Sequence, residues 1–493
     1  MSNYKHGTYG EFAESIGEVA TQSGTVAVYV GIAPVNLIRG YSKSVNAPVK
    51  LSDMKNVQEY MGYSKNWAAF DLCEAFQVHF GNPIGNVGPI VAINVLDPAT
   101  HKKTEQTTKS ITFVNGRATF ESDTIILDTL VIADKVEGTD FTIGYDFSRG
   151  QVVITSIGDA VSGAATVTYS EVDVSMVDTD TIIGSATEAG AYTGLGCIGL
   201  VYQELNLIPN LLLCPGWSDK PEVYKAMIAA GTKINGHWDA FVYADIPVLD
   251  ASGDTSTKVD TINLAKSWKD TNNYANGRSK VFWPQAKDTS GNIYHTAVLG
   301  AWRSMIVDAS HDGIPMESPS NKAVPVAKQY FGEGSTNRGF DQSTANDLNA
   351  NGITTVVYWG GQWVLWGPHT AAYKYGSVND NRNIFDNSIR MMMHVSNSFQ
   401  AEHALTIDQP MTRAMADTIK NREQEKADAW AAMGAFIGTP VVSFNQNDNS
   451  TAALVEGDFV WSFEGTPTPP FKSGTLKVAY TTAGFDSYFG EVE

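Results

Sequence analysis

The residues whose spacing most resembles a reaction site are the three glycines of Gly194–Gly199, which form a G-x-G-x-x-G pattern. In a dinucleotide-binding site such glycines let the backbone approach a pyrophosphate, and an acid about 20 residues further on, here Asp219, binds the ribose. That site also needs a strand before the first glycine and a long helix after the last. Here residues 184–193 are small and polar, and residues 200–205 span barely two helical turns. The pattern favours a helix-start loop, and a nucleotide-dependent oxidoreductase using Gly194–Gly199 stays as the alternative function.

A second cluster has the ligand types of a cation site. Residues 250–256 place Asp and Ser at alternate positions, as in a calcium loop. However, Thr255 stands where that loop needs glycine, and Thr261 stands where it needs the closing glutamate. We therefore predict a turn here, followed by a helix over 261–268, and no metal ion.

Other catalytic and metal-binding patterns are missing from the sequence. There is no G-x-S-x-G elbow and no G-x-x-x-x-G-K-[ST] loop, which excludes two common α/β mechanisms. No two histidines have metal-ligand spacing, since even His394 and His403 do not lie on adjacent helical turns. The sequence therefore predicts a protein that is not an enzyme and that has no catalytic residues, no cofactor and no metal.

Composition bounds the class of protein. A chain of 493 residues is long enough for roughly two to four domains, and its 43% hydrophobic content is ample for buried cores. The net charge of −19 argues against nucleic acid or an anionic membrane as partner. Three separate cysteines indicate buried thiols in a reducing compartment. We find no export signal and no apolar run long enough to insert into a membrane.

The elements along the chain predict a mixed α/β sheet core. Apolar runs at 206–217 and 238–247 flank a helical pattern at 219–231, with Ser218 or Asp219 as N-cap. Such strand–helix–strand units favour a mostly parallel, buried sheet. A similar α/β pattern, with a strand beginning at Val26, precedes it.

Residues 104–180 differ in kind from this core. They contain five short β-branched runs separated by glycine turns, which predicts an inserted antiparallel β domain. Residues 101–190 hold 14 Asp and Glu against 6 Lys and Arg, so we expect an acidic, solvated surface. A binding module, with this domain as an adhesin, is a further functional class that the pattern leaves open.

The last third of the chain predicts a hairpin at 356–366 around Gly360–Gly361, then helices at 389–403 and 409–436. Strands are expected at 441–444, 458–463 and 475–481. The last of these is apolar, lies near the chain end, and has no obvious partner.

These patterns define six expected parts of the fold. They are an N-terminal extended arm at 1–24, an α/β core segment at 25–103, the inserted domain at 104–180, the main α/β core at 181–386, a helical and β part at 387–474, and a C-terminal strand arm at 475–493.

Several short motifs follow one another along nearly the whole chain. They are GTYGEF at 7–12, NLLLCPG at 210–216, DIP at 245–247, Pro284, ASHDGIP at 309–315 with SPSN at 318–321, NGI at 351–353, and Trp366-Gly367 with Thr370. Together and in this order they resemble the contractile tail sheath proteins of bacteriophages and phage-like particles such as R-type bacteriocins. Two features depart from the family: Pro368 and His369 replace a basic residue common in it, and only some members carry the acidic insertion.

The resemblance implies a structural subunit that forms stacked hexameric rings around a tail tube and contracts to drive the tube through a bacterial envelope. The implied partners are neighbouring sheath subunits, the tube protein, and baseplate and tail terminator proteins. The particle would be assembled in the host cytoplasm, and no nucleic acid or membrane insertion is implied. Terminal arms would enter sheets of neighbouring subunits, and the candidate arm contacts are Tyr9, Phe12, Leu476, Val478 and Tyr480. The alternative for these residues is an edge strand folded back on its own domain.

Overall fold

An eight-stranded, mostly parallel sheet forms the centre of the computed structural model, which describes residues 21–187, 190–248 and 259–488. Only the two edge strands run antiparallel to their neighbours. The strand order across the sheet is β19 (Gln362–Trp366), β18 (Ile353–Trp359), β14 (Ser279–Phe282), β13 (Phe241–Asp245), β12 (Leu211–Leu213), β1 (Thr21–Gly31), β3 (Val87–Asn94) and β2 (Pro48–Leu51).

The central strands are continuous apolar runs because helices and loops cover both faces of a parallel sheet. Every residue of β3 and of β13 is buried. β1 pairs in parallel with β3 on one side and with β12 on the other, which places the chain's first described strand in mid-sheet. This is the mixed α/β core, built from discontinuous segments, that the sequence predicts.

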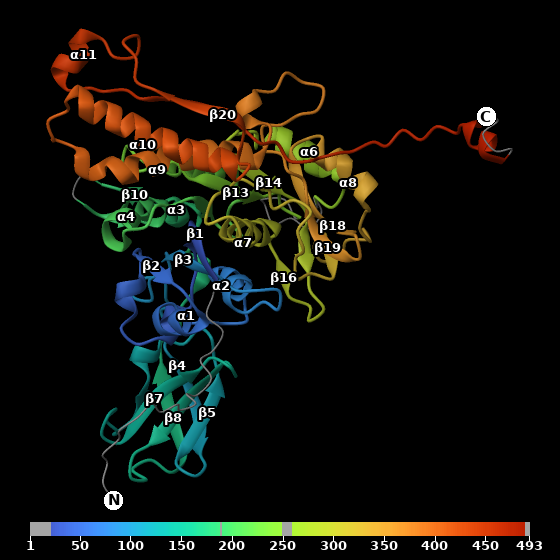
Figure 1. Cartoon of the computed structure of the whole chain (residues 1–493). Coiled ribbons are helices and arrows are strands. Elements are labelled where there is room, and N and C mark those ends of the chain that lie inside the picture. Colours follow the sequence, from blue (N-terminus) through green and yellow to red (C-terminus); the bar gives the residue numbers. More distant parts are fainter. Residues whose placement is uncertain (1–20, 188–189, 249–258, 489–493) are drawn as a thin grey trace, which may run out of the picture.

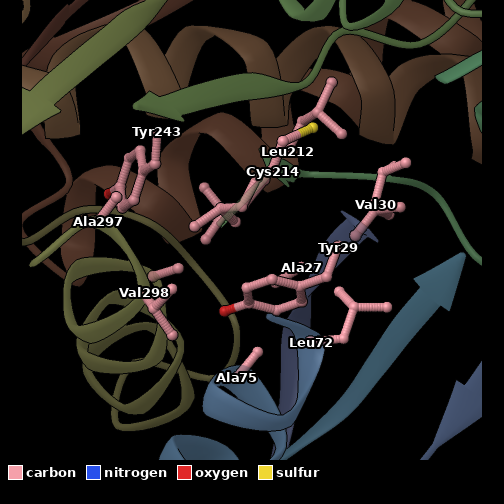
Figure 2. Packing of buried hydrophobic residues seen from close by; sticks show 14 of the residues in the cluster. Ala27, Tyr29, Val30, Leu72, Ala75, Leu212, Cys214, Tyr243, Ala297 and Val298 are labelled. Atoms are coloured by element: carbon pink, nitrogen blue, oxygen red, sulfur yellow. The ribbon is translucent and has the colours of Figure 1, made fainter. Parts of the chain in front are cut away.

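Two helices pack directly on the middle of this sheet. The side chain of Tyr29 from β1 lies between Ala75 of α2 and Val298 of α7 (Figure 2). Its hydroxyl hydrogen-bonds His79 at 2.7 Å, so the buried phenol is satisfied. The helices of the chain are α1 (Met54–Tyr60), α2 (Leu72–Phe80), α3 (Thr179–Ile183), α4 (Leu200–Leu205), α5 (Pro221–Ala230), α6 (Ile262–Thr271), α7 (Thr296–Ala309), α8 (Gln342–Asn349), α9 (Asp386–His403), α10 (Arg413–Ala432) and α11 (Thr451–Glu456).

The inserted β domain projects from the core (Figure 1). It consists of two three-stranded antiparallel sheets around a separate apolar cluster. Leu37, which belongs to the core segment, is 1% exposed and completes that cluster. The neighbouring Asn36 amide donates to the carbonyls of Asp123 and Ile125 at 2.9 and 2.8 Å. The sheets contain β4 (Thr107–Phe113), β9 (Gly163–Tyr169) and β6 (Val131–Ile132), and β5 (Arg117–Glu121), β8 (Gln151–Ser156) and β7 (Phe141–Asp146).

The C-terminal unit comprises α9, α10, α11 and a two-stranded sheet of β20 (Phe436–Ser443) and β21 (Ser462–Pro467). Met391, Trp430 and Phe436 contribute to its own small apolar cluster. Two further small sheets flank the core. They are β10 (Ser185–Ala186) with β11 (Tyr192–Thr193), and β15 (Gln285–Lys287) between β16 (Ile293–Tyr294) and β17 (Lys328–Tyr330).

Several sequence expectations differ from the structure at element ends. α5 has Lys220 at its N-cap, not Ser218 or Asp219, because Pro221 occupies the first helical turn. β1 begins at Thr21 rather than at Val26, with a register shift between Gln22 and Ala27.

The last long helix also ends earlier than the apolar spacing predicts. α10 stops at Ala432, because Gly434 at φ +90° breaks the helix, and Phe436 already starts β20. β21 accordingly lies four residues after the expected start of its strand, at Ser462 rather than at Asp458.

The position of Leu37 predicts that the inserted domain depends on the core for its stability. We expect Leu37→Ala to lower the free energy of unfolding by about 2–4 kcal/mol, since it leaves a cavity in the inserted domain's cluster. The measurement is urea unfolding combined with limited proteolysis of residues 104–180. Leu405→Ala, at an 89% exposed leucine, is the matched control. Equal stabilities of the two variants would contradict the prediction.

Candidate assembly surface

The residues that follow β21 leave the body of the molecule as an extended segment (Figure 1). Residues 469–482 form neither helix nor strand, so the strand expected at 475–481 is absent from the single chain. Leu476, Val478 and Tyr480 are 86%, 85% and 82% exposed. These three alternate with polar or small residues, which puts them on one face of an extended backbone. In the described residues this segment does not pair with its own domain, and Tyr9 and Phe12 lie outside the described residues, so the role of both arms stays a prediction.

More apolar side chains line the same segment. Phe471 is 90% exposed, and Phe485 and Tyr488 are 53% and 77% exposed. Single exposed apolar residues are ordinary, but six of them within 18 positions make this segment an apolar strip of sequence that water contacts unfavourably. The strip has the composition of a segment that becomes buried against a partner.

The two-stranded sheet of the C-terminal unit offers one open edge. The backbone amide of Val442 donates to the side chain of Gln424 and therefore points away from β21. Val442 and its partner Phe463 are thus a non-hydrogen-bonded pair of the antiparallel sheet. By the same alternation, the backbone groups of Phe463 and Gly465 point outward from β21. Among the hydrogen bonds of the described residues, we find no partner for these outward groups.

The opposite edge of this sheet is closed by a side chain. The Gln424 amide of α10 donates to the Pro440 carbonyl and accepts from the Val442 amide, both at 2.8 Å. A side-chain amide in this position imitates one residue of a neighbouring strand, which is a known way to protect a sheet edge.

An apolar groove of about 350 Å³ lies beside β21. Its walls come mainly from α9, from β20 and from residues 461–463. A chain added along β21 would place alternate side chains on the sheet face that the groove adjoins. The apolar lining residues are Met392, Val395, Phe399, Val442, Trp461 and Phe463.

Two glycines of the Gly194–Gly199 loop pack against the backbone of their own chain. A Cβ on Gly194 would lie 2.3 Å from the Ile182 carbonyl, and one on Gly196 would lie 2.2 Å from the Ser185 carbonyl. The glycines therefore permit close packing of the loop on its own chain. The strand before them, β11, pairs only with β10 and is outside the parallel sheet. The alternative oxidoreductase function is not supported.

The place where an α/β enzyme holds its substrate is the carboxyl end of the parallel strands. Here a cavity of about 660 Å³ contains Glu74, Asp245 and His295. Glu74 accepts from the His295 backbone amide at 2.6 Å and from its Nδ1 at 2.7 Å. Asp245 accepts from the Ala297 amide at 3.0 Å. These bonds fix the first turn of α7 to α2 and β13, which is a structural role.

One group of side chains in the described residues has the spacing of metal ligands. Atoms of Glu402, His403 and Glu423 lie within 4.8 Å of one another. Lys426 contacts both glutamates, at 2.7 and 2.8 Å, and the His403 imidazole bonds Glu423 at 2.7 Å. Lys426 already supplies a positive charge to both glutamates, so the group is an ion-pair cluster between α9 and α10. The calcium-like loop at 250–256 lies outside the described residues, and no described helix is long and apolar enough to cross a membrane.

Comparison of sequences connects the whole chain to proteins of known type, although no family model matches it. It is 26% identical over 506 aligned positions, 98% of each chain, to the tail sheath protein of Burkholderia phage BcepMu. It is 24% identical over 307 positions, 61% of this chain and 70% of the relative, to the tail sheath protein of Escherichia phage P2.

Comparison of structures gives the same fold. A chain in the baseplate of the anti-feeding prophage superposes with a TM-score of 0.55 at 11% identity, covering 98% of this chain and all of that one. A chain in the contracted sheath complex of the extracellular contractile injection system PVC gives 0.53 at 12% identity, covering 98% and 99%. The mixed α/β fold class predicted from sequence is therefore confirmed.

The pair of Glu74 and His295 predicts a specific pH dependence. Burial alone would lower the pKa of His295, but the attraction of Glu74 raises it to about 10. Because this folded-state pKa lies above the unfolded value near 6.5, the stabilisation is complete below pH 6.5 and is lost as pH rises towards 10.

We expect Glu74→Gln to cost roughly 3 kcal/mol at pH 6.5 and to flatten the decline between pH 7 and 10. The measurement is urea unfolding from pH 6 to 10. Glu456→Gln, an exposed glutamate in α11, is the control. A variant curve parallel to the wild-type curve over this range would contradict the assignment.

Proposed function

We propose that this chain, a homologue of phage tail sheath proteins, is the structural subunit of a contractile tail sheath. The observation that carries the proposal is the exposed, alternating apolar segment around Leu476, Val478 and Tyr480, which needs another chain to complete a strand. The protein is a component of a phage tail or contractile injection system, and it is a structural protein, not an enzyme. The division into arms, core, inserted domain and C-terminal unit is part of the same proposal.

Strand addition explains how subunits connect. The C-terminal arm of one subunit pairs with the open β21 edge of a second, at the outward backbone groups of Phe463 and Gly465. Its apolar side chains then enter the groove between β21 and α9. Gln424 keeps the β20 edge closed to the same arm. The N-terminal arm, with Tyr9 and Phe12, supplies a second connection between neighbours.

These connections would build hexameric rings of subunits that stack around a tail tube. Baseplate and tail terminator proteins would bind the two ends of the stack, and assembly would take place in the bacterial cytoplasm. The extended sheath is metastable in this proposal. Contraction rotates subunits outward and buries more surface between them, which releases free energy, while the arms keep the lattice connected. The movement drives the tube through a bacterial envelope, in an infectious phage or in a headless particle of the R-type bacteriocin kind.

We expect the apolar face of the C-terminal arm to control polymerisation. The double variant Leu476→Asp with Val478→Asp, or truncation after Ser473, should raise the critical concentration roughly 100-fold or more, because burial of two to three such side chains is lost. Electron microscopy and sedimentation of purified chains give the measurement. Lys477→Ser with Ala479→Ser changes the other face of the same arm and is the matched control. If the apolar-face variant and the control polymerise alike, strand addition by this arm is wrong.

We also expect salt to affect assembly, because each subunit carries a net charge of −19 and like charges repel as subunits approach. Screening lengths fall from about 10 Å at 0.1 M to about 4 Å at 0.5 M salt, so polymerisation should become easier over this range. Light scattering against salt concentration measures the effect, with an uncharged solute of equal osmolality as control. Assembly that is indifferent to salt up to about 0.5 M would rule the repulsion out.

A further inference from the structure

The root of the N-terminal arm is tied to helix α7 by a buried side-chain bond. The Thr25 hydroxyl donates to Asp308 Oδ2 at 2.6 Å, although the two residues are 283 positions apart. The next amide, that of Val26, donates to the Asn210 side chain at 2.8 Å. Thr25 and Asp308 are 3% and 0% exposed, so water does not compete for this bond.

The root of the C-terminal segment is tied to α9. The Asn387 amide nitrogen donates to the Thr468 carbonyl at 3.0 Å and to the Met316 carbonyl at 2.9 Å. The Thr468 amide donates to the Ala435 carbonyl at 2.9 Å. Thr468 is the last residue held in this way before the exposed segment begins.

One helix connects these two roots. Arg390 of α9 forms a buried ion pair with Asp308, the acceptor of Thr25. Asn387, the donor to Thr468, is one helical turn earlier on α9. Asp386 pairs with Lys280 of β14, and both side chains are fully buried. The two positive and two negative charges of these ion pairs sum to zero. Removing one partner of a buried ion pair strongly destabilises a protein, because the other charge stays buried without a partner.

We propose that the first two turns of α9 couple the roots of the two arms, with Arg390 and Asn387 as the positioning residues. The inference rests on the proposed function, since it concerns how the roots of the two arms of one subunit move together. A displacement of the N-terminal root moves Thr25, then Asp308, then Arg390. A helix of 18 residues transmits that movement to Asn387, and hence to Thr468.

The side-chain route from Thr25 to Thr468 is separate from the backbone pairing of the sheet. β1 is also held by backbone pairing with β3 and β12, so loss of the Thr25 hydroxyl leaves the sheet intact. Asn387 likewise lies outside every strand. The side-chain route can therefore be interrupted without unfolding the core, and its loss should appear at the opposite arm root.

The test is hydrogen exchange of the monomer in Thr25→Val and Asn387→Ala. We expect Thr25→Val to speed exchange of the Thr468 amide, and Asn387→Ala to speed exchange of the Val26 amide, each about 5- to 30-fold, the equivalent of one buried hydrogen bond. Thr355→Val and Asn36→Ala are the matched controls. Thr355 is a buried threonine of β18, and the buried Asn36 donates, like Asn387, to two backbone carbonyls, those of Asp123 and Ile125.

The coupling is established if each variant changes the opposite root and the controls change neither root by more than about twofold. Effects confined to the mutated root, or equal effects of the controls, overturn it. Sheaths of the Thr25→Val chain should also break into shorter pieces on contraction than those of Thr355→Val. A wild-type chain that never polymerises would count against the proposed function alone, because the exchange experiment uses monomers.

Discussion

Pairing of backbone hydrogen-bonding groups is the constraint on which this structure depends. The eight-stranded sheet satisfies it for the core, because each inner strand pairs with a neighbouring strand on both sides. The inserted domain satisfies it separately with two small sheets. In the C-terminal unit, β20 is covered by Gln424, while β21 keeps an outward row of groups. The exposed segment after Thr468 forms no strand in the described residues, and we propose that it pairs with the β21 edge of another subunit.

Local signals were enough to predict much of this fold from the sequence. The hairpin of β18 and β19 was predictable because Gly360 and Gly361 form a two-residue turn between aromatic strands. The inserted domain was predictable because its turns and β-branched runs are short-range patterns. The apolar alternation around Val478 indicated a strand without an obvious partner, and in the described residues this segment is exposed and forms no strand.

What could not be predicted depends on contacts between distant residues. Leu37 reads as an ordinary apolar residue of the core segment, yet it fills the cluster of another domain. Gln424 looks like any polar residue of an exposed helix, and its role follows only from the path of β20 beside α10. The bond between Thr25 and Asp308 spans more than half of the chain. No periodicity or motif encodes such pairs, because they arise where separately formed elements meet.

The attachment of the inserted domain has a consequence for the outline of any particle built from this chain. Leu37 and Asn36 fix the domain to the core through packing and two hydrogen bonds, so it is not a bead on a flexible tether. Held in this way at its root, the domain would turn together with the core. Because its far end lies well outside the body (Figure 1), a small turn of the core sweeps that end through a long arc. In the proposed contraction, the far end of the acidic domain would thus move further than the core of its own subunit.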